Sequence, residues 1–402
     1  MLATVSRMLF VADAHEPLTE RDWDEATVRE AVATIATDAE AAFDPETLWP
    51  AHPMDELEES EQLTSLYLGA AGVVWALHRL ERRGAVELTR DWIDVAASLP
   101  TRYVTNPDLA EEVGGRIPSL LLGEAGVLVV AHGFAPTLEL EQRLLDVVRG
   151  NAQNPTRELL WGSPGTMLVA NALWERTGDS VWVGAWQESA DWLWGEWRDG
   201  VWEQDIFGRK SVILGPAHGL AGNVLALAGD DHLDVDRRQE LERRAVETLS
   251  RLAMREDGLA QWSPSLQEAD KPEKWRLQWC HGAPGIVASL SDIARADDEW
   301  TELLEAGGEL TWRAGPLVKG AGLCHGTGGN GFAFLKLFER TGDDRWLDRA
   351  RRFAMHAIEQ VERARETCGR GRYTLWTGDV GAALYLQSCL DVDAAFPTID
   401  FF

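Results

Sequence analysis

The chain has 402 residues, of which 45% are hydrophobic, so it can bury a large core. Its 66 acidic residues outnumber its 38 basic residues and give a formal net charge of −28. Because this charge repels phosphate groups at long range, the composition disfavours nucleic acid and anionic membrane surfaces as partners.

The first 60 residues are expected to hold one outer helix and a lead-in segment. The helix is predicted over about Asp24 to Ala42. The apolar run from Met8 to Ala12 is too short for a secretory signal. No segment reaches the roughly 18 uninterrupted apolar residues of a membrane span. Four cysteines form no disulfide framework in a chain of this length, so a cytoplasmic location is expected.

One pattern recurs from residue 61 to residue 390: a Gly-x-x-Gly pair that opens an apolar stretch with helical periodicity. Successive pairs begin 39 to 63 residues apart, which is enough for two helices and their loops. Each unit is therefore predicted to be a helical hairpin. The seven pairs are Gly69/Gly72, Gly123/Gly126, Gly162/Gly165, Gly219/Gly222, Gly282/Gly285, Gly326/Gly329 and Gly378/Gly381.

The two kinds of segment in each unit differ in polarity. The stretch after a glycine pair is apolar nearly all round, as in Val224 to Leu227, and predicts an enclosed inner helix. The alternating segments, such as Arg237 to Arg251 and Asp343 to Glu362, are charged and amphipathic and predict outer helices. Two glycines on one helical face also allow backbones to pack closely.

Helix ends are also visible in the sequence. In the third and sixth units, Gly178-Asp179 and Gly342-Asp343 follow similar helical segments. A glycine that ends one helix and an Asp that caps the next predict the boundary between an inner and an outer helix.

The end of the chain favours a closed ring over an open solenoid. A solenoid would end in a polar capping unit, whereas the last unit here has a complete glycine pair and an apolar helix, Ala382 to Leu390. We therefore predict an all-α fold, an α/α toroid (barrel) of seven inner and seven outer helices, as a single domain over residues 1–402.

Two segments interrupt the repeats, at residues 198–216 and 255–278. Both are rich in Trp, Gly, Asp and Arg and are predicted to be irregular. Loops of this length in a compact domain are commonly functional. Because they flank His218 and Cys280, we expect them to form the rim of a site.

Cys280, Cys324 and His325 are the candidate metal ligands. Cys280-His281 and Cys324-His325 stand at equivalent places, each directly before a glycine pair. Two thiolates and an imidazole would hold Zn²⁺ and leave its fourth position open, as in catalytic zinc sites. The alternative is that both cysteines pack as small apolar groups, but two copies at equivalent repeat positions favour metal.

Other polar residues border the same motifs. His218 precedes its glycine pair as His281 and His325 precede theirs, and it is a candidate general acid or base. His281 is also counted as a candidate catalytic residue. Glu158, four residues before Gly162, could orient His218.

Two cations border the Cys-His units. Arg276 and Lys319 lie four and five residues before Cys280 and Cys324. They could stabilise an enolate or bind an anionic group of a ligand. The alternative for Arg276, Lys319 and Glu158 alike is an ordinary solvated charge.

These motifs resemble those of the lanthionine synthetase C-like family, the LanC and LanC-like proteins. The resemblance covers about residues 60–390 and rests on the seven glycine pairs together with Trp279-Cys280-His281-Gly282 and Leu323-Cys324-His325-Gly326. It implies an α/α toroid that holds zinc through Cys280, Cys324 and His325, with His218 and Arg276 at the family's other active-site positions.

Within the family, the chain is more similar to the stand-alone LanC-like branch. Bacterial lantibiotic cyclases usually have Asp at the position of Glu158 and often Tyr at that of His281. The LanC-like branch, which Lys319 also favours, is associated with the addition of glutathione to dehydroamino acids. In both branches a thiol adds to dehydroalanine or dehydrobutyrine in a peptide or protein and leaves a thioether. The thiol is a peptide cysteine or a small thiol such as glutathione.

Two other functions stay open. Glycoside hydrolases also use α/α toroids, but they need two carboxylates about 5–10 Å apart, and no acidic residue recurs at the glycine pairs. A non-catalytic scaffold that binds peptides or proteins could use zinc to pin two repeats together. Such a site would normally have four protein ligands, the fourth being His218 or His281.

Overall fold

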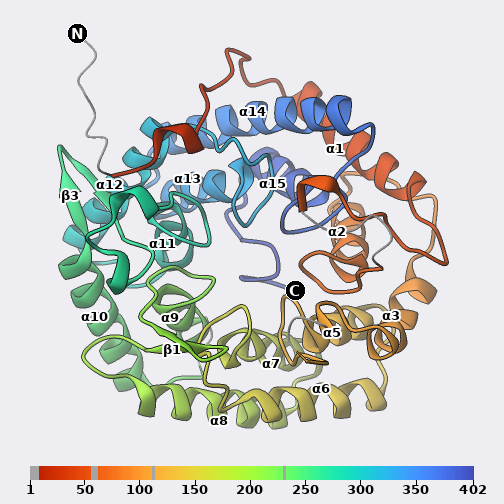
Figure 1. The fold of residues 1–402 in the computed structure, drawn as a ribbon, viewed down its shortest axis with the longest axis horizontal. Helices are drawn as coiled ribbons and strands as arrows, with labels where there is room; N and C mark the ends of the chain where they lie inside the picture. The colour runs from red at the N-terminus through yellow and green to blue at the C-terminus, as the bar shows by residue number, and fades with distance from the viewer. Residues whose placement is uncertain (1–8, 56–61, 111–113, 230–231) are drawn as a thin grey trace.

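Two concentric rings of helices make up the protein (Figure 1). The structure is a computed structural model, and it describes residues 9–55, 62–110, 114–229 and 232–402. Within these ranges there are fourteen α-helices, which alternate between the inner and the outer ring. The predicted α/α toroid of seven inner and seven outer helices is confirmed. Residues 1–8, which bear on the absence of a secretory signal, lie outside the described residues.

Every inner helix begins directly after the first glycine of a pair. The inner helices are α2 (Ala70–Arg82), α5 (Glu124–Phe134), α7 (Ser163–Thr177), α9 (Leu220–Ala228), α11 (Ala283–Leu290), α13 (Thr327–Thr341) and α15 (Asp379–Asp391). All residues of α9 and α11 are buried, as their apolar sequences predict. These helices therefore form the wall of the central core.

The second glycine of each pair leaves space for a backbone carbonyl. A Cβ atom added there would lie 1.8–2.3 Å from the carbonyl oxygen of the residue six positions earlier, at all seven pairs. For Gly285 the carbonyl oxygen is that of Trp279, and for Gly329 it is that of Leu323. Each lies 1.8 Å from the added Cβ. Because no side chain fits, the loop before each inner helix folds back tightly onto the helix start.

The same glycines join each unit to the one before it. A Cβ on Gly126 would lie 3.0 Å from the Cβ of Leu66, and later pairs repeat this contact around the ring. Gly72 of the first unit faces the Cβ of Leu375 in the last unit, at 2.8 Å from an added Cβ. Helix α15 also packs against α2 and α1, so the ring is closed.

Six of the seven outer helices begin at an Asp or Thr cap instead of a glycine, and α3 begins after Trp92. The outer helices are α1 (Glu25–Ala41), α3 (Ile93–Thr105), α6 (Leu138–Asn151), α8 (Ser180–Glu196), α10 (Val235–Leu252), α12 (Asp298–Ala314) and α14 (Asp344–Cys368). Asp179 and Asp343 cap α8 and α14 by accepting backbone N–H groups. Gly178 and Gly342 end α7 and α13 with φ of 67° and 69°. The predicted boundaries are thus confirmed.

The two segments predicted to be irregular contain short antiparallel hairpins. Strands β1 (Gln204–Ile206) and β2 (Arg209–Ser211) pair in the first, and β3 (Met254–Glu256) and β4 (Leu259–Gln261) pair in the second. Phe207-Gly208 and Asp257-Gly258 make the two-residue turns, all with positive φ. The prediction of irregular structure was wrong here, because a residue-glycine pair with positive φ favours a two-residue hairpin.

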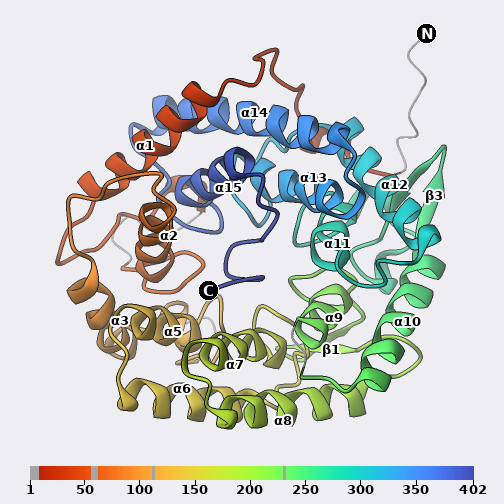
Figure 2. The same ribbon diagram turned by 180° about the vertical axis from the view of Figure 1, so that it is seen from behind.

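The last segment of the chain turns from α15 into the middle of the ring (Figure 2). There Phe401 packs against Trp75 of α2, with ring centroids 5.6 Å apart, and the Arg79 guanidinium lies 4.4 Å from its ring centroid. Asp400 forms an ion pair with Lys336 of α13 at 2.9 Å. The described helices include none with the length and apolar composition to cross a bilayer.

Candidate active site and metal centre

The residues two positions before the glycine pairs meet on the inner rim, at the N-terminal ends of the inner helices. The backbone N–H of Cys280 donates to the carbonyl of Cys324 at 3.1 Å, and that of Cys324 donates to Trp376 at 2.9 Å. The N–H of Trp376 in turn donates to Tyr67 at 3.3 Å, which links the last unit to the first. The repeat geometry therefore brings together thiols that are 44 residues apart in the sequence.

The two cysteine thiols are buried and hydrogen-bonded to each other. The hydrogen bond from Cys324 is the largest influence on Cys280. With a bond from the Gln278 amide, 2.8 Å from Sγ, it lowers the pKa of Cys280 to about 7 against the opposing effect of burial. The shared hydrogen bond and burial raise the pKa of Cys324 well above its usual value. One thiol of the pair therefore ionises readily near neutral pH, and the thiolate is the metal-binding form of cysteine.

The two histidines beside these cysteines are neutral imidazoles. Burial, followed by the charges of His218, Arg276 and Lys319, lowers the pKa of His281 to about 3. Burial and the nearby charge of Lys319 lower that of His325 to about 4. Because a histidine binds metal only when it is unprotonated, both side chains are in the ligating form at neutral pH.

The donor chemistry fits a soft divalent cation such as Zn²⁺. Two touching thiols, one of them readily ionised, and a neutral imidazole next in sequence are typical zinc donors. Over the part of the chain that the structure describes, no three His, Cys, Asp or Glu side chains are grouped as metal ligands. Cys280 and Cys324 are thus brought together, whereas zinc and the ligand role of His325 stay predictions.

His218 is held beside the thiols by Glu158. Its Nδ1 lies 2.9 Å from Oε2 of Glu158, whose side chain is fully buried. Burial alone would lower the pKa of His218, but the hydrogen bond and the charge of Glu158 outweigh burial and raise it. The ring of His218 stacks on that of His281 with centroids 5.7 Å apart. A protonated imidazole is thereby favoured next to a neutral one.

Glu158 also has a structural role in the loop before α7. Its carboxylate accepts backbone N–H groups of Leu160, Trp161 and Gly162 at 2.6 to 3.2 Å. These bonds hold the loop that leads into α7. Because the same carboxylate bonds to His218, the position of the imidazole is tied to the rigid start of an inner helix.

Arg276 and Lys319 lie in exposed positions at the mouth of the site. Both contribute to the lowered pKa of His281, and Lys319 also acts on Cys280 and His325. Their charges are thus close enough to the thiol pair to meet an anionic group of a ligand there.

Three further residues of the site were not predicted from the sequence, although their register could have revealed them. Tyr67 hydrogen-bonds to Cys324 and stands two residues before its glycine pair, as the cysteines do. Gln278 stands four residues before its pair, as Glu158 does, and Arg372 stands six before, as Arg276 does.

Arg372 is held by Asp55, for which the repeats give no signal. The Nε of Arg372 lies 3.1 Å from both carboxylate oxygens of Asp55, and both side chains are buried. The charge of Arg372 lowers the pKa of His325, and the charge of Asp55 raises it. Asp55 lies on the lead-in segment, where a short 3₁₀ turn (Pro53–Asp55) brings it to the last unit of the ring. This contact depends on the closed ring and not on the repeat.

Comparisons with known proteins agree with this geometry. The family profile described as lanthionine synthetase C-like protein matches residues 55–401. The chain is 34% identical over 134 residues to LanC-like protein GCL1 of Arabidopsis thaliana, and 33% identical over 127 residues to Glutathione S-transferase LANCL1 of Danio rerio. Each alignment covers 31% of this chain, and they cover 30% and 31% of the two relatives, so the chain matches less than a third of their lengths.

A solved structure shows the same fold. Nisin cyclase superposes on 91% of this chain and 94% of its own, with a TM-score of 0.60 and 15% identity.

Proposed function

The chain belongs to the lanthionine synthetase C-like family, and on this premise we propose that it is a zinc-dependent enzyme that adds a thiol to a dehydroamino acid. The observation that carries the proposal is the meeting of the Cys280–Cys324 thiol pair with the His218–Glu158 pair at one rim of the toroid. The first pair has the chemistry to hold a metal ion, and the second has the chemistry to move a proton.

Cys280, Cys324 and His325 would hold the zinc ion. Zinc with three protein ligands supplies Lewis acidity that favours the deprotonated form of a substrate thiol. The positive partial charges at the N-terminal ends of the inner helices, which converge here, favour thiolates at the same place.

His218 is the proposed proton donor and acceptor. The S–H bond of the substrate thiol breaks, a new S–C bond forms at the β-carbon of the dehydroamino acid, and the C=C electron pair moves to form an enolate. The α-carbon then takes a proton from His218, and the proton lost by the thiol restores the imidazolium. Glu158 keeps His218 oriented and favours its protonated form.

We propose a small thiol of the glutathione type as the nucleophile and a dehydrated peptide or protein as the acceptor. The Danio rerio relative is named as a glutathione S-transferase. In this chain, Arg276 and Lys319 carry positive charge at the exposed mouth of the site. They would meet the carboxylates of such a thiol or the developing enolate.

The test is to incubate the zinc-loaded protein with glutathione and a dehydroalanine peptide and to detect the thioether adduct by mass spectrometry. We expect Cys280→Ser and Cys324→Ser to lose bound zinc, measured by elemental analysis, and to lower the rate by about 10³-fold or more. Cys368→Ser is the matched control, because Cys368 ends α14 on the outer ring. It should retain both zinc and activity.

Three results would contradict parts of the proposal. If Cys324→Ser formed the thioether at an unchanged rate, the proposed metal site would be contradicted. If the protein cyclised a peptide through the peptide's own cysteine and formed no glutathione adduct, the nucleophile would be a peptide thiol and not a small thiol. Zinc-loaded protein that forms no thioether with either thiol would contradict the enzyme assignment itself.

A further inference from the structure

A cavity lies at the end of the inner helices opposite to the thiols. It has a volume of about 370 Å³ and lies among the last turns of α7, α9, α11 and α13 and the C-terminal segment 393–402. We call it the distal cavity. Helix α11 has 8 residues, so the distal cavity is separated from Cys280 by about 12 Å along this helix. None of the residues proposed for thiol addition lines it.

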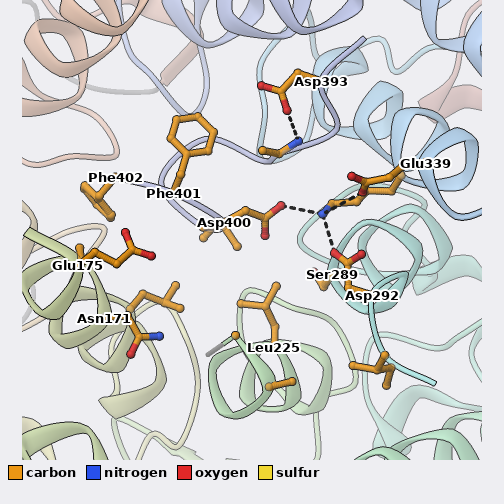
Figure 3. Close-up of a pocket in the computed structure, with 18 of the residues that line it drawn as sticks. Asn171, Glu175, Leu225, Ser289, Asp292, Glu339, Asp393, Asp400, Phe401 and Phe402 are labelled. Carbon is orange, nitrogen blue, oxygen red and sulfur yellow. Dashed lines mark hydrogen bonds and ion pairs between the residues drawn. The ribbon is translucent and has the colours of Figure 1, made fainter. Parts of the chain in front are cut away.

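Two buried polar side chains in the distal cavity lack a partner. Asn171 is 7% exposed and Ser289 is 8% exposed. Neither Oδ1 of Asn171 nor Oγ of Ser289 has a hydrogen-bond partner among the described residues. Figure 3 shows both side chains at the wall of the cavity, on α7 and α11. Because an unpaired buried polar atom is costly, Oδ1 of Asn171 indicates a ligand that donates a hydrogen bond, and the hydroxyl of Ser289 is able to accept a second one.

The charged residues that line the distal cavity favour a positively charged ligand. The cavity is lined by two basic residues, Lys336 and Arg238, and by five carboxylates. These carboxylates are Glu175, Asp292, Glu339, Asp393 and Asp400 (Figure 3). Lys336 lies 2.8 Å from Asp292 and 2.9 Å from Asp400. Arg295 pairs with Asp292 and Glu339, and Arg83 pairs with Asp393. Five carboxylates thus face four cations, Lys336, Arg238, Arg295 and Arg83, and a net negative charge remains.

The C-terminal ends of two inner helices add negative partial charge to the distal cavity. Ser289 lies in the last turn of α11, and Leu225 and Ala228 lie in the last turn of α9. The C-terminal end of a helix carries a negative partial charge, which stabilises cations near it. The carboxylates and the helix ends therefore act in the same direction.

The remaining walls are apolar. Leu225 comes from α9, and Phe401 and Phe402 come from the C-terminal segment. A volume of about 370 Å³ is at the small end of the range for ligand pockets. The distal cavity thus combines hydrogen-bond acceptors, negative charge and apolar surface.

From these observations we propose that the distal cavity binds a small organic ammonium ion with an apolar body, such as an alkylamine or alkyldiamine. The ammonium group donates to Asn171 Oδ1 and Ser289 Oγ and faces the carboxylates, while the alkyl chain packs on Leu225 and the terminal phenylalanines. This site is separate from thiol addition and does not depend on the function proposed above.

The test is calorimetric titration of the full-length, zinc-loaded protein with pentylamine, 1,5-diaminopentane, 1-pentanol and pentanoate. We expect binding of at least one amine, and affinities at least about tenfold lower for the alcohol and the carboxylate. Absence of binding by both amines would overturn the proposal. Equal binding of pentanol and the amines would show that the cavity recognises only apolar surface, which would also overturn it.

Substitutions separate a binding role from a structural one. Asn171→Leu and Ser289→Ala remove the unpartnered atoms, so each should weaken amine binding by about tenfold while the melting temperature stays equal or rises. Ser163→Ala is the matched control, because Ser163 is also fully buried with an unpartnered Oγ but begins α7 at the other end. It should leave amine affinity unchanged. Unaltered amine binding by Asn171→Leu, or an equal loss in Ser163→Ala, would contradict the assigned site.

Discussion

The two ends of the inner helices are built on different principles. At the N-terminal end, backbone dominates: glycines allow the preceding loop to press on the helix start, and adjacent units are hydrogen-bonded through their main chains. At the C-terminal end, side chains dominate, with Lys336 between Asp292 and Asp400 and a chain segment that enters the middle of the ring.

This difference explains the location of the residues proposed for thiol addition. A backbone scaffold holds the positions before each glycine pair in place and leaves their side chains open to variation. Tyr67, Cys280, Cys324 and Trp376 occupy the same register in different units. The end made of side chains has no such register, because each contact there depends on the identity of both partners.

The largest effect is expected from a methyl group at the N-terminal end. Gly285→Ala would place a Cβ 1.8 Å from the carbonyl oxygen of Trp279 and 2.8 Å from Cδ of Pro216. We expect the free energy of unfolding to fall by about 4 kcal/mol or more, measured by urea denaturation. Gly184→Ala is the control, since nothing lies within 4 Å of its added Cβ in the outer helix α8.

That control should stabilise the protein by up to about 1 kcal/mol, because alanine favours helix more than glycine does. Equal stability of the two variants would show that the glycine pairs tolerate side chains, and the proposed contrast between the two ends would be lost.

A smaller loss is expected at the C-terminal end. Lys336→Met would leave Asp292 and Asp400 without their buried cation, and the free energy of unfolding should fall by about 3 kcal/mol. Lys210→Met is the matched control, because Lys210 is 63% exposed and pairs only on the surface with Glu203. A denaturation midpoint for Lys336→Met equal to that of Lys210→Met would contradict a structural role of the buried network.

The smallest effect concerns the pH dependence of thioether formation. Glu158 raises the pKa of His218, and a general acid is active in its protonated form, so the rate should fall as the pH rises through this pKa. Glu158→Gln removes the charge, lowers the pKa of His218 and should move the fall in rate to lower pH. The maximal rate should drop by about tenfold.

Glu141→Gln provides the comparison for this variant. Glu141 lies 3.3 Å from His132, in a histidine–glutamate pair away from the thiols. Its pH profile should coincide with that of the unmodified protein. A profile that Glu158→Gln does not move would indicate that His218 is not the titrating acid.

The repeat made much of the fold and part of the site predictable. Seven glycine pairs predicted the alternation of helices, and their register placed Cys280, Cys324 and His218 on one rim. The register also includes Tyr67 and Gln278, but neither belongs to a Cys-His unit, so the motifs alone do not single them out. The hairpins depend on two-residue turns such as Asp257-Gly258, which are a more local signal than the length and composition of the segments.

The distal cavity could not be predicted in this way. Asn171, Ser289 and Asp400 share no repeat position, and Asp400 reaches Lys336 only because the C-terminal segment enters the ring. The Asp55–Arg372 pair has the same origin, since it joins the lead-in segment to the last unit.

By itself the sequence determined the number of helical units, the boundaries that glycine and aspartate set, and the register of the thiols. These follow from local steric and hydrogen-bonding rules that act within one unit. Tertiary structure alone decided which other distant side chains meet, as in Asp55 with Arg372 and Asp400 with Lys336. These contacts form because the two chain ends pack onto repeat units of the closed ring, and no local rule relates the chain ends to those units.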